Sequence, residues 1–126
     1  MMSAKILVVD DSGMSRRLLR RMLETAGHEV TEAEDGLSAL ELYFIERPAL
    51  VLLDMVMQGM YGLEVLARLR ELDPQARVIV ATADIQASTL ALAREAGACG
   101  LITKPFVTER VLEATRAVLA GGESWN

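Results

Sequence analysis

The chain has 126 residues, a formal net charge of −5 at pH 7 and 52% hydrophobic residues. This length and composition are typical of one globular domain with a buried core, and they leave no room for a second folded domain. The acidic balance argues against direct binding to nucleic acid or to an anionic membrane, and apolar runs of only a few residues exclude insertion into a membrane.

Short apolar runs alternate with amphipathic segments along the whole chain. The runs are bounded by Gly, Pro or acidic residues and predict strands at Lys5–Val9, Glu29–Glu32, Leu50–Leu53, Val78–Ala81 and Gly100–Thr103. The segments that follow them show helical spacing and predict helices at Ser12–Ala26, Leu37–Ile45, Gly62–Leu72, Ser88–Ala96 and Thr108–Ala120. Strands separated by helices favour an α/β fold, in which helices cover both faces of a doubly wound parallel sheet.

Polar residues follow the predicted strands in the positions where such sheets bind ligands. Asp10 and Asp11 follow the first strand, Asp54 the third, Thr82 the fourth and Lys104 the fifth. Taken singly, each has an ordinary interpretation, since an acid after a strand is often the cap of the next helix. Because four strand ends carry residue types that one reaction needs, we favour a shared site over four unrelated loops.

Three neighbouring carboxylates repel one another unless a cation lies among them. Oxygen ligands of this kind suit Mg²⁺, which uses one or two carboxylates and a substrate phosphate. Lys104 would supply a second cation and Thr82 a hydroxyl donor. The set predicts phosphoryl transfer in which an aspartate is the nucleophile.

The sequence resembles a known family in segments that span nearly the whole chain. These segments are KILVVDDS, VLLDMVMQGMYG, VIVATAD and GACGLITKPF. They are similar to the CheY-like receiver domains of two-component response regulators. The resemblance implies a five-stranded, flavodoxin-like three-layer sandwich with strand order 2-1-3-4-5, formed by one receiver domain over residues 1–126 with a core at about 4–121 and a tail at 122–126.

The resemblance also implies roles for individual residues around a Mg²⁺ ion. Asp54 would be the phosphoacceptor and a metal ligand, and Asp11 would bind the metal directly. Asp10 would act on the metal through a bound water, and Val56 would offer its backbone carbonyl.

Three further positions would form the switch of a receiver. Thr82 would bond the phosphoryl group, Lys104 would pair with Asp54 and then with that group, and the Lys104–Pro105 peptide would be cis. Leu101 stands where many receivers carry Tyr or Phe, which predicts altered coupling to the output face.

We expect a cytoplasmic protein, because no apolar run is long enough to span a membrane and the N-terminal run meets acidic residues too early for a signal peptide. The resemblance implies that it takes a phosphoryl group from a histidine kinase and catalyses only its own phosphorylation and dephosphorylation. A downstream protein effector would bind the face drawn from Ser88–Ala96, Gly100–Thr103 and Thr108–Ala120.

Alternatives remain open: a receiver excised from a longer DNA-binding regulator or hybrid kinase, or a pseudo-receiver that is not phosphorylated. An aspartyl-nucleophile hydrolase is disfavoured because the residue two after Asp54 is Val56 rather than a second aspartate. An FMN binder is disfavoured because the acids Asp10 and Asp11 would repel its phosphate.

Four minor expectations complete the sequence-based picture. We expect Asp84 to cap the following helix, His28 to lie in a solvated loop, and the segment 121–126 to be frayed. Met55, Met57 and Met60 are expected to fill the core, with an adaptable docking rim as the alternative.

Overall fold

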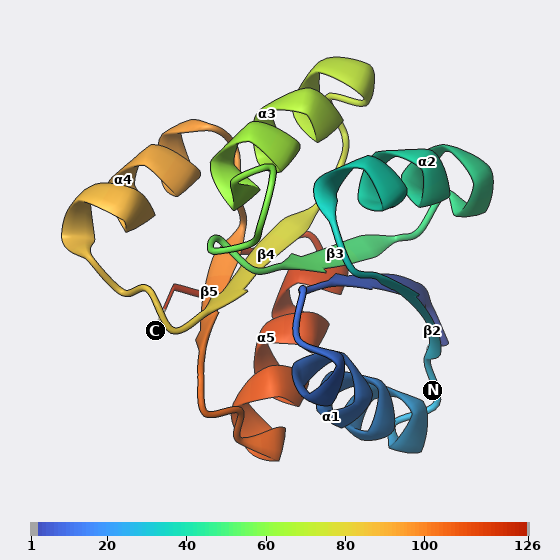
Figure 1. Cartoon of the computed structure of the whole chain (residues 1–126). Coiled ribbons are helices and arrows are strands. Elements are labelled where there is room, and N and C mark those ends of the chain that lie inside the picture. Colours follow the sequence, from blue (N-terminus) through green and yellow to red (C-terminus); the bar gives the residue numbers. More distant parts are fainter. Residues whose placement is uncertain (1–2, 126) are drawn as a thin grey trace.

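The computed structural model describes residues 3–125 and contains one five-stranded sheet surrounded by helices (Figure 1). The strands are β1 (Lys5–Val9), β2 (Glu29–Ala33), β3 (Leu50–Leu53), β4 (Val78–Thr82) and β5 (Gly100–Thr103). The helices are α1 (Gly13–Thr25), α2 (Gly36–Glu46), α3 (Gly62–Leu72), α4 (Ala87–Glu95) and α5 (Thr108–Leu119). All strand pairs are parallel, and their order β2-β1-β3-β4-β5 confirms the predicted fold class.

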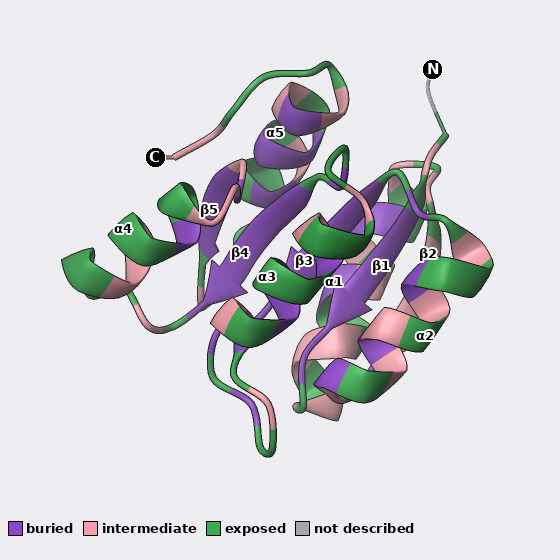
Figure 2. Cartoon of the chain, turned by 90° about the horizontal axis from the view of Figure 1, so that it is seen from above, coloured by how far each residue is buried: buried purple, intermediate pink, exposed green. Residues whose placement is uncertain are grey.

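Helices cover both faces of the sheet, so that the molecule has three layers. α1 and α5 lie on one face, and α2, α3 and α4 lie on the other (Figure 1). Alternate residues of β1 enter the two cores: Ile6 packs on the α1 and α5 side, whereas Leu7 packs on the opposite side. Burial on both faces explains why the central strands are almost continuously apolar in sequence and, apart from Lys5 at the start of β1, buried (Figure 2). No helix in residues 3–125 is long and apolar enough to cross a membrane.

Local chemistry sets where the first two helices begin. The Ser12 hydroxyl accepts a hydrogen bond from the Ser15 N–H at 3.2 Å, and the Asp35 carboxylate accepts one from the Ser38 N–H at 2.8 Å. Each side chain satisfies a backbone donor that the first helical turn leaves free. The cap of α1 fixes the exit direction of the chain just after Asp10 and Asp11.

The expectation of a frayed tail is wrong for the described part of the chain. Ser124 forms a parallel bridge with Gly100 at the outer edge of β5. The Ser124 N–H donates to the Cys99 carbonyl at 2.9 Å, and the Leu101 N–H donates to the Ser124 carbonyl at 2.8 Å. Backbone pairing to an edge strand therefore orders residues that composition alone marks as loose, whereas Asn126 lies outside the described residues.

His28 also differs in part from the sequence-based expectation. It is half-buried, and its Nδ1 accepts a hydrogen bond from the Ala4 N–H at 3.1 Å. The imidazole thus anchors the segment that leads into β1: His28 lies in a loop, as expected, but its side chain is only partly solvated.

Candidate functional site

The parallel sheet brings the predicted acidic residues together at the carboxyl ends of its central strands. β1 and β3 are neighbours, with Val9 opposite Leu53, so Asp10 and Asp54 emerge side by side. Asp10, Asp11 and Asp54 each offer one carboxylate oxygen, and these oxygens all lie within 4.8 Å of one another. Asp10 and Asp54 are buried, whereas Asp11 is exposed. The cluster is therefore reached from solvent on the side of Asp11.

Lys104 supplies a cation to this cluster from the end of β5. Its Nζ lies 2.9 Å from Asp10 Oδ2 and 3.1 Å from Asp54 Oδ2, and of these two contacts the one with Asp54 has hydrogen-bond geometry. The Lys104 N–H donates to the Thr82 carbonyl, and the following Lys104–Pro105 peptide bond is cis. A single lysine thus faces three carboxylates.

Burial and charge act in opposite directions on the titrating groups. Burial raises the pKa of Asp10 above its usual range, although Lys104 and the Ser12 N–H favour its charged form. Burial alone would lower the pKa of Lys104, but Asp10 and Asp54 outweigh that effect and raise it. The lysine is therefore held firmly in its charged form beside the carboxylates.

Backbone N–H groups from two loops hold the three carboxylates in place. Val56 donates to Asp54 Oδ1 at 3.2 Å, and Ser12 donates to Asp10 Oδ1 at 2.9 Å. Across the site, the Gln58 N–H donates to Asp11 Oδ2 at 3.3 Å, which ties the loop after β3 to the loop after β1. Gln58 thus contributes its backbone to the site.

Thr82 and Leu101 occupy the positions of the predicted switch. Thr82 is fully buried at the end of β4, and its hydroxyl accepts a hydrogen bond from the Asp84 N–H at 3.1 Å. Within residues 3–125 no hydrogen bond joins the Thr82 hydroxyl to the side chain of Asp54 or of Lys104. Leu101 is 8% exposed and packs into the core on the α4 side of the sheet.

The predicted capping role of Asp84 is wrong. The residue at the N-cap of α4 is Gln86, and its side chain makes no capping hydrogen bond. Asp84 instead accepts a hydrogen bond from the Gln86 N–H at 3.2 Å, within the loop that precedes the helix. α4 begins at Ala87, within one residue of the predicted start, so Asp84 lies two residues before the N-cap residue.

Arg16 is a residue at the site that the sequence pattern did not single out. Its Nη1 donates to the Asp10 carbonyl at 2.7 Å, and its Nε pairs with Glu32 at 3.0 Å. Arg16 thus links α1 and β2 to the backbone of the acidic loop. Its place one helical turn after the Ser12 cap is the sequence signal that points toward this loop.

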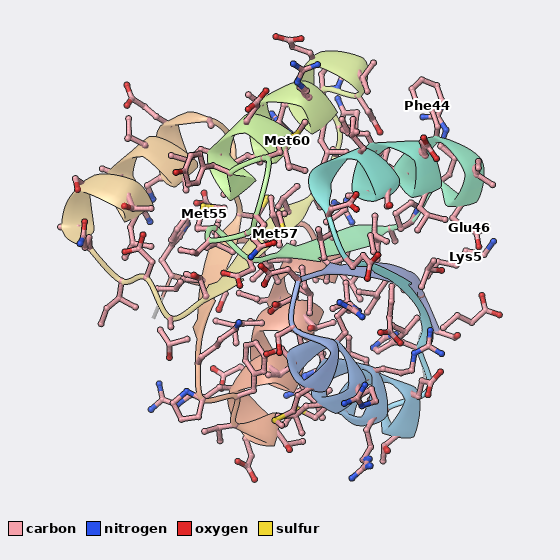
Figure 3. All side chains as sticks on the ribbon, viewed as in Figure 1. Lys5, Phe44, Glu46, Met55, Met57 and Met60 are labelled. Carbon is pink, nitrogen blue, oxygen red and sulfur yellow. The ribbon has the colours of Figure 1, made fainter. Side chains whose placement is uncertain are left out.

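The methionines near Asp54 pack inward, as Figure 3 shows for the loop that follows β3. Met55 and Met57 are buried, and Met60 is half-buried against the same core. Their expected role as core residues is confirmed, and the docking rim is not what the structure shows. Gly62 begins α3 so close to this loop that a Cβ atom there would lie 2.6 Å from Met55 Cα.

The donor set fits a hard divalent cation. Three carboxylates lie together, and Lys104 is the lysine that reaches two of them, Asp10 and Asp54. Such an arrangement leaves negative charge that a cation with oxygen ligands neutralises. Asp10, Asp11 and Asp54 are thus the residues suited to hold Mg²⁺.

Comparisons with known proteins agree with this geometry. The sequence model of the response regulator receiver domain family matches residues 6–116. The chain belongs to the receiver-domain family. This receiver is 40% identical over 119 residues to the chemotaxis protein CheY of Bacillus subtilis, a match that covers 94% of the chain and 99% of the relative. It is 39% identical over 119 residues to sporulation initiation phosphotransferase F of the same organism, covering 94% and 96%.

A solved structure shows the same fold. In the crystal structure of the CheX-CheY-BeF3-Mg complex from Borrelia burgdorferi, a chain with 29% identity superposes with a TM-score of 0.87, covering 90% of this receiver and 87% of that chain. The protein is thus a CheY-like receiver domain of a two-component system. Its acidic cluster lies at the carboxyl ends of the strands, where sheets of this kind bind ligands.

Proposed function

We propose that this receiver accepts a phosphoryl group from a histidine kinase on Asp54, with Mg²⁺ held by Asp10, Asp11 and Asp54. One observation carries the proposal: three carboxylate oxygens lie within 4.8 Å of one another, beside a lysine that reaches Asp54 at 3.1 Å. We further propose that residues 1–126 form a single receiver domain, that the protein is cytoplasmic, and that it catalyses only its own phosphorylation and dephosphorylation.

Asp54 is the carboxylate that suits the nucleophile. It lies between Lys104 and the loop of Val56, whose N–H holds Oδ1 and leaves the carboxylate fixed in orientation. In the transfer, a bond from an Asp54 oxygen to phosphorus forms while the bond from phosphorus to the donor nitrogen breaks, and the leaving imidazole keeps the electron pair. Bound Mg²⁺ would supply charge neutralisation for the phosphoryl oxygens.

The chain's own residues then hold the product. Lys104 exchanges its contact with Asp54 for one with a phosphoryl oxygen, and the Thr82 hydroxyl turns from the Asp84 N–H toward the same group. Val56 would offer its backbone carbonyl to the metal, and Asp10 would act on it through a bound water. Because Thr82 is the last residue of β4 and Lys104 directly follows β5, contacts with the phosphoryl group would act on both strands.

We infer the phosphoryl donor and the effector from the receiver-domain family. A relative named a phosphotransferase and a CheY solved in a complex with CheX, BeF3 and Mg support a kinase as donor and a protein as the recipient of the signal. We place the effector on the face of α4, β5 and α5, with Leu101 as the buried switch residue beneath it. The proposal includes no direct contact with nucleic acid.

Intact mass spectrometry after incubation with acetyl phosphate tests the proposal. We expect a gain of one phosphoryl group that requires both Mg²⁺ and Asp54, so that Asp54→Asn gains none. Asp35→Asn is the matched control, since Asp35 caps α2 and takes no part in the acidic cluster. A folded wild type that gains no phosphoryl group under any condition, or an Asp54→Asn variant that gains one, would contradict the proposed function.

A further inference from the structure

The tail, residues 122–125, occupies an edge of the sheet that would otherwise be open. β5 is an outer strand, and its far side has no strand neighbour. The tail passes from the end of α5 to this edge, where Ser124 bridges Gly100 in parallel register (Figure 2). The match to the receiver-domain family model ends at residue 116, so this segment lies outside the part of the chain that the family model describes.

Gly100 leaves room for this contact because it has no side chain. A Cβ atom on residue 100 would collide with the carbonyl oxygen of Ser124, and its three nearest heavy atoms would all be backbone atoms of Ser124. Any side chain at position 100 would therefore prevent the tail from pairing, while meeting no other part of the molecule as closely. The close approach of two backbones is one of the uses of glycine in a strand.

The side chain of Trp125 completes the contact on the α4 side. The guanidinium carbon of Arg94 lies 4.5 Å from the centroid of the indole ring, and the indole N–H donates to Glu123 at 2.7 Å. Trp125 packs against the same core as Leu90 of α4 and lines a shallow groove with it. Cation–π stacking and partial burial favour an aromatic residue at this position.

The edge continues beyond the tail. Leu101 directs its N–H to Ser124, whereas Lys104 directs its N–H to β4, so Thr103 faces the same outer side as Leu101. Thr103 is exposed, and no residue within 3–125 pairs with its backbone on that side. Arg110 and Glu113 of α5 line a groove along this stretch, and Arg94 and Glu95 of α4 line a separate groove with Trp125. The edge thus suits a longer extended segment.

We propose that the β5 edge and the α4 groove form a docking site for an extended peptide with an aromatic side chain, and that the tail fills this site in cis until a partner's segment of the same kind replaces it. Addition of a strand to an exposed sheet edge is a common mode of peptide recognition, with main-chain bonds for affinity and a side-chain pocket for specificity. The role of this exchange in signalling rests on the proposed function, whereas docking itself is a property of the unphosphorylated protein.

The first experiment measures docking of the tail in the full chain. Trp125 is the single tryptophan, so its fluorescence reports on the tail alone. We expect Gly100→Ala to shift the emission to longer wavelength, to increase quenching by acrylamide, and to speed amide exchange at Leu101 and Ser124 by about tenfold or more. Gly13→Ala is the control, because its Cβ meets only arginine side chains of α1. Unchanged fluorescence and exchange in Gly100→Ala would overturn the proposal.

The second experiment tests the site in trans. Ser124→Pro removes the N–H that binds the Cys99 carbonyl and empties the site while Gly100 stays in place. A fluorescein-labelled GGESWN peptide should bind this full-length variant at least about tenfold more tightly than wild type, whose own tail competes. Adding Gly100→Ala to Ser124→Pro should abolish binding. Equal affinity for all three proteins, or binding to none of them, would overturn the proposal, and neither result depends on phosphorylation of Asp54.

Discussion

Replacing Lys104 with methionine removes the cation that balances two buried carboxylates. The Lys104 ammonium lies 2.9 Å from Asp10 and 3.1 Å from Asp54, and these carboxylate side chains are 2% and 6% exposed. Loss of one partner of a buried ion pair costs about 3–5 kcal/mol. Because the lysine side chain itself is 23% exposed, we expect the low end of that range, about 3 kcal/mol of unfolding free energy.

Urea unfolding at pH 7 without divalent ions measures this loss directly. The expected result is a lower midpoint with an unchanged slope, since the surface exposed on unfolding stays the same. Lys5→Met is the matched control, because Lys5 is the other lysine of the chain and lies exposed at the start of β1, at the opposite end of the strand from Asp10 (Figure 3). A Lys104→Met variant within about 0.5 kcal/mol of wild type would refute the electrostatic reasoning.

Two further predictions test packing and titration. Gly62→Ala should cost about 1–3 kcal/mol in urea unfolding and slow phosphorylation by acetyl phosphate, because the new methyl group presses on the Asp54–Met55 backbone. Tyr43 donates a hydrogen bond to Asp73 at 2.7 Å, and Tyr43→Phe should cost about 1 kcal/mol at pH 7. Burial and Asp73 raise the pKa of Tyr43 from 10.0 to about 12, so the difference between wild type and Tyr43→Phe should shrink as pH rises above 10. The hydrogen bond from Tyr43 lowers the pKa of Asp73 from 3.8, so the difference should shrink again as pH falls below that value. A difference that is constant across this range, or a Gly62→Ala variant as stable and as reactive as wild type, would contradict these expectations.

Much of the fold could be predicted because burial on two faces leaves a clear pattern in the sequence. Continuous apolar runs such as Val78–Thr82 occur where helices cover a sheet on both sides, and crossover helices require the strands to be parallel. The acidic residues could be predicted to meet because each directly follows a strand. The sequence could not show Arg16 bound to the Asp10 carbonyl, since an arginine on an amphipathic helix is usually solvated.

The tail shows why other features could not be predicted. Glycine and polar residues near the end of a chain usually indicate fraying. Here these residues are held in a fixed conformation by a long-range contact, because Ser124 pairs with a strand edge that forms only when the sheet is assembled. In the same way, the half-buried position of His28 depends on the Ala4 N–H, which is distant in sequence and adjacent in the fold. Contacts of this kind produce no local periodicity in the sequence from which they could be predicted.

Localisation of the phosphoryl group to one residue tests the central claim most directly. Borohydride reduces an aspartyl phosphate to homoserine, and fragmentation of the digested protein then identifies the modified position. After incubation with acetyl phosphate and Mg²⁺, we expect homoserine at position 54 and unmodified aspartate at positions 10 and 11. Homoserine at Asp10 or Asp11 in place of Asp54, or phosphate on a residue outside the acidic cluster, would contradict the account.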